Sequence, residues 1–303
     1  MASVASNDGF PDYYDGRGGI AQWDIANDTW GTNIEPTGQV DRVTAYETNS
    51  GEMWISWGEL RLDLYDASGI FVGSWNSDDG LDFPIREIVE YNGEVLFATE
   101  DGVARYDRST NSWLSTWQEN NGLPSNSGSE FYELWTNGVD LVLGGGDGQG
   151  FQGFQGGAIS HWDGADWNVY TQSGQGGIQR GYPITMAYCG GLLNVGIYDS
   201  NGGIEQIDLA TDTVVNTLTR ASLGEGRVSG VACDQSTDTL YVSFYEDEEP
   251  IKKYDMNGGV FLSDISTQTH NLPSDRIWWD AIDYSNGELI VGHGLGQSGP
   301  NVI

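Results

Sequence analysis

A repeat runs through almost the whole of this 303-residue chain and limits the folds that it can adopt. Each copy has an aromatic or apolar residue followed by Asp, then a short polar turn, then usually another aromatic or β-branched residue. The six copies are Trp23-Asp24 to Trp30, Tyr65-Asp66 to Phe71, Tyr106-Asp107 to Trp113, Trp162-Asp163 to Trp167, Ile207-Asp208 to Val214, and Tyr254-Asp255 to Phe261. Successive Asp positions lie 42, 41, 56, 45 and 47 residues apart. Periods of about 40 to 50 residues are typical of propellers and solenoids.

A second unit lies between these copies: an apolar strand, a turn that usually contains Gly or Asn, and another apolar strand. Its six copies fall at residues 40–57, 85–99, 129–145, 182–197, 228–244 and 276–292. Short β-branched and aromatic runs separated by such turns predict antiparallel hairpins. Two hairpins per period give four strands, and a four-stranded repeat of this length is the blade of a β-propeller. The sequence therefore predicts an all-β protein with a single β-propeller domain over residues 1–303.

The two ends of the chain carry different hairpins. An outer hairpin comes first, at residues 18–34, and an inner hairpin comes last, at residues 276–292. Six four-stranded blades result if these two pieces pair in one shared blade, and such closure would protect strand edges. The alternative is a fragment of a seven-blade or longer propeller, because the tail GQSGPNVI resembles the start of a further outer strand.

Two inner hairpins follow a Leu-Pro-Ser turn. The matching residues are Gly122, Leu123, Pro124, Ser125 and Asn126 in one copy, Leu272, Pro273 and Ser274 in a second, and Gly80-Leu81 in a degenerate third. With these turns the sequence resembles the two-component regulator propeller repeat, in which a G-L-P-S-N turn precedes the inner strand. The resemblance implies a propeller that serves as a sensor or ligand-binding domain, often outside the cytoplasm.

The charge balance restricts the partners. Forty-five acidic side chains against 12 basic ones give a net charge of −33, which argues against nucleic acid because phosphate is bound by Lys and Arg. No apolar run is long enough for membrane insertion. Such acidity is typical of salt-adapted, marine proteins but also of ordinary acidic secreted ones. We expect an extracellular or cell-surface location, although no signal peptide is recognised in this chain and the cytoplasm of a halophile is the alternative.

Most of the residues that could react or bind a metal ion are expected to have structural roles. His161, His270 and His293 fall in different repeats and are expected to be surface or turn residues rather than a metal trio. Cys189 and Cys233 occupy equivalent places in adjacent repeats, which predicts two buried free thiols. The repeated Asp residues are interpreted as turn residues. No cofactor is expected, and calcium has only a weak signal, because the acidic turns lack the alternating ligands of an EF-hand loop.

The irregular connections are the best candidates for a binding site, since function is concentrated on loops held by a rigid scaffold. A Gly-rich insertion at Gly144 to Gly157 and long connections at residues 198–203, at residues 245–250 and in the shared blade (residues 7–18 with 292–299) all join second to third strands. They are expected on one face, near the central axis. The predicted ligand-binding residues are Asp147, Phe151, Phe154, Arg180, Tyr198, Asp199 and Glu246.

The leading hypothesis is a non-catalytic binding or scaffolding propeller that contacts a glycan, peptide or protein. A carbohydrate-active enzyme, either a polysaccharide lyase or a hydrolase, is the alternative, because paired carboxylates can act as acid and base. The candidates for that chemistry are Asp147, Asp199, Glu246, Asp247 and Glu248.

Overall fold

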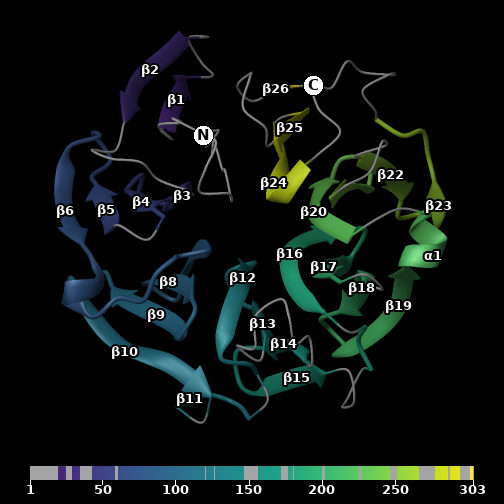
Figure 1. Cartoon of the computed structure of the whole chain (residues 1–303), viewed down its shortest axis with the longest axis horizontal. Helices are drawn as coiled ribbons and strands as arrows, with labels where there is room; N and C mark the ends of the chain where they lie inside the picture. Colours follow the sequence, from purple (N-terminus) through teal and green to yellow (C-terminus); the bar gives the residue numbers. More distant parts are fainter. Residues whose placement is uncertain are drawn as a thin grey trace, which may run out of the picture.

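The fold was analysed in a computed structural model, which is all-β, as the sequence predicts. It describes residues 20–24, 29–34, 43–58, 61–119, 121–125, 127–146, 156–171, 177–179, 181–199, 202–224, 227–245, 251–265, 277–285, 287–293 and 301–302. Within these residues the strands form consecutive antiparallel sheets arranged around a common centre (Figure 1).

Five sheets are complete blades, each containing four strands that are neighbours in sequence. The first two are β3 (Val43–Glu47), β4 (Met53–Trp57), β5 (Arg61–Tyr65) and β6 (Phe71–Trp75), then β7 (Glu87–Tyr91), β8 (Glu94–Thr99), β9 (Gly102–Asp107) and β10 (Ser112–Glu119). The next is β12 (Glu130–Thr136), β13 (Leu141–Gly146), β14 (Gly157–Trp162) and β15 (Trp167–Thr171). The last two are β16 (Tyr182–Cys189), β17 (Leu192–Tyr198), β18 (Gly203–Asp208) and β19 (Thr213–Thr219), then β20 (Arg227–Asp234), β21 (Thr239–Tyr245), β22 (Ile251–Asp255) and β23 (Val260–Phe261).

Short elements connect and extend these blades. They are the 3-10 helix η1 (Ser77–Asp79), strand β11 (Gly122–Leu123), which pairs in parallel with β10, and the helix α1 (Arg220–Leu223). The first strand of each blade is innermost, and β3, β7, β12, β16, β20 and β24 (Ile277–Ser285) contact one another in that order. This arrangement is a β-propeller (Figure 1).

The pairing at the chain ends differs from the predicted closure. The N-terminal hairpin, β1 (Ile20–Asp24) and β2 (Thr29–Ile34), forms its own two-stranded sheet. The place beside β25 (Glu288–His293) that we predicted for β1 is occupied by β26 (Asn301–Val302). Because β26 follows β25 closely in sequence, this pairing closes a short loop, which costs less entropy than recruiting the distant N-terminus. It matches the alternative, in which the tail begins a further outer strand.

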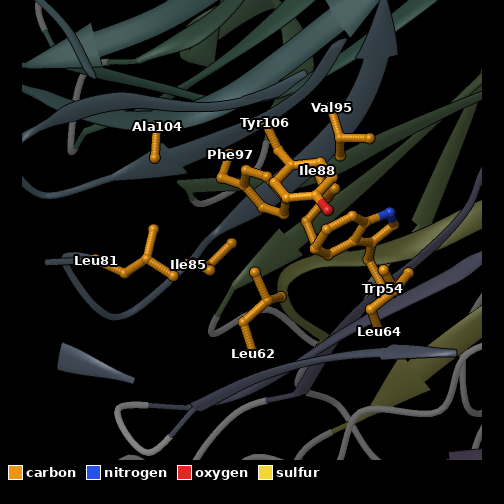
Figure 2. Packing of buried hydrophobic residues seen from close by; sticks show 10 residues of the cluster. All are labelled: Trp54, Leu62, Leu64, Leu81, Ile85, Ile88, Val95, Phe97, Ala104 and Tyr106. Carbon is orange, nitrogen blue, oxygen red and sulfur yellow. The ribbon is translucent and has the colours of Figure 1, made fainter. Parts of the chain in front are cut away.

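Large aromatic and aliphatic side chains fill the space between the first two complete blades (Figure 2). Trp54 on β4 is fully buried, and its ring centroid lies 5.0 Å from that of Tyr106 and 5.3 Å from that of Phe97. Both partners belong to the neighbouring blade, so the rings that fill the core also join the two blades. Edge-to-face contacts of this kind add to the free energy gained by burying the rings.

The repeated Asp residues are turn residues, as predicted. In five turns the Asp Oδ1 accepts a hydrogen bond from the backbone N–H two residues ahead, and the sixth, Asp24, has no described side chain. The five donors are Ser68 at 2.9 Å, Ser109 at 2.7 Å, Ala165 at 2.8 Å, Ala210 at 2.9 Å and Asn257 at 2.9 Å. The carboxylate replaces a backbone acceptor, which explains the recurrence of Asp at this point of each repeat.

The Gly-Leu-Pro-Ser motif has a packing explanation. Gly122 has a positive φ of 90°, and a Cβ there would lie 2.2 Å from the ring of Trp117, so no larger residue fits. Leu123 is buried in the cluster shared by the β7–β10 and β12–β15 blades, and the Ser127 hydroxyl donates to the carbonyl of Pro124 at 2.8 Å. The motif therefore directs the chain from the outer strand of one blade to the inner strand of the next.

Cys189 and Cys233 form a disulfide, so the prediction of two free thiols was wrong. The prediction assumed that equivalent atoms of neighbouring blades are too far apart to bridge. They are not, because β16 and β20 are adjacent innermost strands and their Cα atoms at these positions are 5.6 Å apart. This spacing falls inside the range that a disulfide requires.

Candidate functional site

The second-to-third strand connections share one face of the propeller with the starts of the innermost strands. In an antiparallel blade the first and third strands start where the second and fourth end. The register shows this directly: Tyr182 at the start of β16 pairs with Tyr198 at the end of β17, and Glu130 pairs with Gly146. We call this side the loop-bearing face.

Two of the predicted site residues are described, and both lie on this face. Tyr198 is the last residue of β17 and Asp199 follows it, with exposed fractions of 4% and 5%. They are therefore packed into the face rather than displayed on it. The other predicted ligand-binding residues lie outside the described part of the chain, and so do the two further enzyme candidates. They are Asp147, Phe151, Phe154, Arg180 and Glu246, with Asp247 and Glu248.

In three of the complete blades the innermost strand carries a bulge next to this face. The register shifts between Phe131 and Glu133 in β12, between Pro183 and Thr185 in β16, and between Val228 and Gly230 in β20. The extra residues are Tyr132, Ile184 and Ser229. A bulge bends the strand and redirects a side chain, and bulges are frequent beside functional sites. The innermost pairs β3–β4 and β7–β8 have unbroken registers.

The bulges in β12 and β16 build a cluster of tyrosines across a blade boundary. The ring centroids of Tyr132 and Tyr182 are 4.9 Å apart, and both rings belong to one buried cluster with Ile184 and Tyr198. A Cβ at Gly146 would lie 2.3 Å from the ring of Tyr182. Because Gly146 has no side chain, the ring of Tyr182 can lie against the end of β13.

One end of the tyrosine cluster is held by Arg86, which directly precedes β7. Its guanidinium carbon lies 4.1 Å from the ring centroid of Tyr132, a cation–π contact. Its Nη2 lies 2.6 Å from Glu100 and 4.0 Å from Glu130. The hydroxyl of Tyr132 donates to Glu130. The arginine side chain is 11% exposed, so its plane is fixed by these contacts.

Arg227, the first residue of β20, holds the other end. Its Nη1 donates to the hydroxyl of Tyr198 at 3.0 Å, and its guanidinium carbon lies 5.3 Å from that ring centroid. Contacts therefore run from the β7 blade to the β20 blade at the starts of their innermost strands. We call this set the inner rim: Arg86, Glu130, Tyr132, Tyr182, Tyr198 and Arg227.

Tyr132 of the inner rim is not activated as a base. Burial raises the pKa of the Tyr132 hydroxyl well above its usual range, the hydrogen bond to Glu130 raises it further, and Arg86 opposes this only in part. A tyrosine that acts as a base needs the opposite shift. Tyr132 is therefore a hydrogen-bond donor at neutral pH.

The side of the propeller opposite the loop-bearing face contains a histidine that the sequence reading misjudged. His161 on β14 is fully buried, not a surface residue. Its Nε2 lies 2.9 Å from Asp140, and its Nδ1 lies 2.5 Å from Asp212 in the next blade. Two carboxylates satisfy the ring nitrogens and so permit burial. His270 and the side chain of His293 lie outside the described residues.

No group of three or more His, Cys, Asp or Glu side chains in the described parts of the chain is placed to hold a metal ion. The acidic segment from Asn76 to Gly80 is a capped turn. The Asn76 side chain accepts the N–H of Asp78 at 2.8 Å, and Asp79 accepts the N–H of Asn76 at 2.9 Å. These groups are used by the local capping box.

The sequence analysis did not select Arg86 and Arg227, although their positions at the starts of innermost strands can be predicted from the repeat. Arg180 was selected because it precedes an innermost strand, and Arg86 and Arg227 have the same place in their own repeats. Applying that reasoning to every repeat would have identified both. The bulge at Tyr132 was not predicted from the sequence.

Comparison with known proteins supports the fold. No family model matches the chain, and no curated protein matches it. Among solved structures, a chain of the mitotic checkpoint complex has a TM-score of 0.67 with 17% identity over 91% of this chain and 78% of that one. The RRP9 WD40 repeats give 0.64 with 12% identity, covering 93% and 84%.

A third similar structure is a domain of a two-component system. The extracellular domain of a putative hybrid two-component system from B. thetaiotaomicron has a TM-score of 0.60 with 14% identity. The match covers 86% of this chain but 33% of that one. At these identities the likeness shows a shared fold, and that fold is the β-propeller.

Proposed function

We propose that this protein is a non-catalytic binding propeller that takes a glycan, peptide or protein partner on its loop-bearing face. The observation that carries the proposal is the inner rim, where side chains from four neighbouring blades make a continuous set of contacts at the starts of the innermost strands. Rigid scaffolds that present loops around such a rim are typical binding platforms.

The chemistry of the rim supports binding rather than catalysis. Its carboxylate Glu130 accepts from Tyr132, and the raised pKa of that tyrosine makes it a poor base. Within the described residues, mutual contacts hold the arginines and tyrosines of the rim in fixed positions. Fixed groups of this kind cost little entropy when a ligand binds.

We also propose that the protein works outside the cytoplasm. The Cys189–Cys233 disulfide supports this, because disulfides persist in oxidising compartments. The similarity to an extracellular domain of a two-component system is consistent with it. In the described residues no helix is long and apolar enough to cross a membrane. The charge of −33 supports a saline setting, where salt screens the repulsion.

The binding proposal is tested with a glycan array and a pull-down on the wild-type protein, followed by variants. Phe151→Ala, Phe154→Ala and Arg180→Ala on the loop-bearing side should weaken binding of the ligand found, with nearly unchanged melting temperatures. Val139→Ala is the matched control, because Val139 is 65% exposed in the turn between β12 and β13 on the opposite side. Equal binding by all variants, or release of a cleaved product from the ligand, would overturn the proposal.

A further inference from the structure

The buried histidine on the side opposite the loop-bearing face links two neighbouring blades. His161 lies on β14 and Asp140 directly precedes β13 of the same blade, whereas Asp212 lies in the turn between β18 and β19 of the next blade. The ring is fully buried, with Nε2 2.9 Å from Asp140 and Nδ1 2.5 Å from Asp212. The two blades are therefore joined through a side chain that can gain or lose a proton.

Both carboxyl groups also accept hydrogen bonds from other donors. Asn137 Oδ1 accepts the backbone N–H groups of Val139 and Asp140 at 2.9 and 2.8 Å, which leaves its Nδ2 to donate to Asp140 Oδ2 at 2.7 Å. The hydroxyl of Tyr170 lies 3.2 Å from Asp212. Burial and the charge of Asp212 raise the pKa of Tyr170 well above its usual range, so this hydroxyl keeps its proton and donates it. The two Asp side chains are 19% and 27% exposed, so water also stabilises their charge.

Two carboxylates impose a protonation state on the ring between them. A carboxylate oxygen only accepts hydrogen bonds, so each ring nitrogen that faces one must carry a hydrogen. Neutral imidazole has a single N–H and can donate to only one of the two groups. The imidazolium form of His161 donates to both, and the two ion pairs compensate for burying its charge.

The repeat places another cation at the equivalent position. Arg105 on β9 occupies the place in its blade that His161 has on β14, two residues before the turn Asp, and the strand register makes Glu94 the counterpart of Asp140. Arg105 donates to Glu94 through Nε at 2.8 Å and through Nη2 at 2.6 Å. A permanent cation therefore pairs with a carboxylate at this point of one blade, which supports a charged ring at the same point of the next.

The other titratable groups beside the ring and its two carboxylates are acidic or phenolic. They come from the ends of β7 and β18, from β15 and from three turns. With the two partners themselves they are Tyr91, Asp140, Asp163, Tyr170, Asp208 and Asp212. The ionised members of this group attract the imidazolium.

We propose that His161, with Asp140 and Asp212, forms a histidine clamp, a pH-sensitive link between the β12–β15 and β16–β19 blades. In the protonated ring both N–H groups donate, one to each blade. When the ring gives a proton to solvent, one nitrogen faces its carboxylate with no hydrogen between them, and the link weakens. This device is independent of the proposed binding function, although the same blade boundary holds Tyr132 against Tyr182 on the loop-bearing face.

Chemical denaturation of wild type and His161→Gln across the pH range tests the clamp. A histidine that holds its proton more tightly in the folded state than in the unfolded one contributes stability that is complete below about pH 6.5 and is lost as the pH rises. The ratio of the unfolding constants of variant and wild type should therefore fall about tenfold or more between pH 6 and pH 9.

Arg105→Gln is the matched control, because it removes a cation from the equivalent position of the neighbouring blade. Arginine stays charged over this range, so the corresponding ratio for Arg105→Gln should be constant. An equally constant ratio for His161→Gln would overturn the proposal.

Nitrogen-15 NMR of the wild-type histidine rings reads the protonation state directly and decides the question even if His161→Gln fails to fold. The ring of His161, assigned through its own backbone resonances, should carry hydrogens on both nitrogens at pH 6 and lose one of them as the pH rises. A ring with a single N–H at pH 6 would overturn the proposal.

A second pair of variants tests the contact between the blades. Asp212→Asn keeps the shape of the side chain but removes its charge, so the His161 ring should lose its proton at a lower pH than in wild type. Asp163→Asn is the control, because it removes a charge from a neighbouring turn where the carboxylate accepts the backbone N–H groups of Ala165 and Asp166. Equal shifts in the two variants would show that the ring responds to negative charge in general, and would overturn the link through Asp212.

Discussion

The first two complete blades and the three that follow have the same strand order, but they differ in strand register and in the side chains that pack within them. The aromatic blades, β3–β10, join their innermost strands in unbroken register and pack Trp54, Trp75, Tyr106 and Trp113 together. The bulged blades, β12–β23, interrupt that register near the loop-bearing face. Of the long connections that we predicted, those after β13, β17 and β21 belong to the bulged blades.

The second strands show the same contrast. In β8 the face-side residues Phe97 and Ala98 have side chains that fill the core, whereas β13 ends in Gly144, Gly145 and Gly146. A Cβ at these glycines would lie 2.7, 2.4 and 2.3 Å from its nearest neighbouring atom. The β12–β15 blade therefore uses this space for close approach of tyrosines and backbone, while the β7–β10 blade uses it for large side chains. Under the proposed function, one part of the ring is organised for stability and the other for presenting a site.

The sharpest test of this division removes the central ring of the aromatic blades. Trp54→Ala should lower the free energy of unfolding by about 5 kcal/mol, the upper end for Trp→Ala, because Trp54 is fully buried against rings of both blades. Chemical denaturation measures the loss. Phe71→Ala is the control, since Phe71 is 53% exposed on an outer strand and should change stability little. A loss below about 1 kcal/mol for Trp54→Ala would contradict the assignment of stability to this cluster.

The bulged blades have a covalent support instead. The Cys189–Cys233 bridge spans 44 residues, for which the chain-entropy account gives about 4 kcal/mol of stabilisation. Cys189→Ala/Cys233→Ala should therefore unfold at lower denaturant than wild type, and reductant should shift wild type but not the variant. If reductant leaves the wild-type midpoint unchanged, the bridge does not support these blades.

The disulfide also marks a limit of reading the sequence. Hairpins, four-stranded blades and the turn role of Asp66, Asp107, Asp163, Asp208 and Asp255 were predictable, because each depends on contacts within one repeat. The bridge depends on how closely two innermost strands approach, which is a property of the ring and not of either repeat. The same holds for His161, whose burial depends on Asp212 of the next blade.

The candidate site was predictable only in part. The choice of face followed from strand order, and Tyr198 and Asp199 lie there. Their burial was not foreseen, because it results from neighbouring blades packing on them. The partners of Arg86 and Arg227 are likewise inter-blade contacts that no single repeat contains.

A smaller change tests whether the bulged blades need their glycines for the site. Gly146→Ala should displace the ring of Tyr182 and cost about 1–3 kcal/mol, as overpacking usually does, because its Cβ would lie 2.3 Å from that ring. It should also weaken ligand binding at the inner rim. Gly156→Ala is the matched control, since nothing lies within 4 Å of a Cβ at that position. Equal melting temperatures and equal affinities for the two variants would show that the tyrosine cluster tolerates displacement.

The smallest expected effect concerns a feature that both regions share. The turn residues Asp107, in the aromatic blades, and Asp234, in the bulged blades, each have a pKa lowered from 3.8 to about 2. The largest cause is the hydrogen bond from a serine hydroxyl, that of Ser109 at 2.7 Å and that of Ser236 at 2.6 Å.

Because both carboxyl groups are more acidic in the folded state than in the unfolded one, their ionised forms stabilise the fold above about pH 4, and that contribution is lost as the pH falls to about 2. Ser109→Ala and Ser236→Ala should each raise the pKa of the adjacent Asp and make the free energy of unfolding depend less steeply on pH between 4 and 2. Carbon-13 NMR titration of the carboxyl groups and denaturation at each pH measure the two effects. Each variant removes a single hydrogen bond to its carboxyl group, so the change in stability should be small and similar in the two regions. A response in only one of them would mean that the difference between the aromatic and bulged blades extends to their turns.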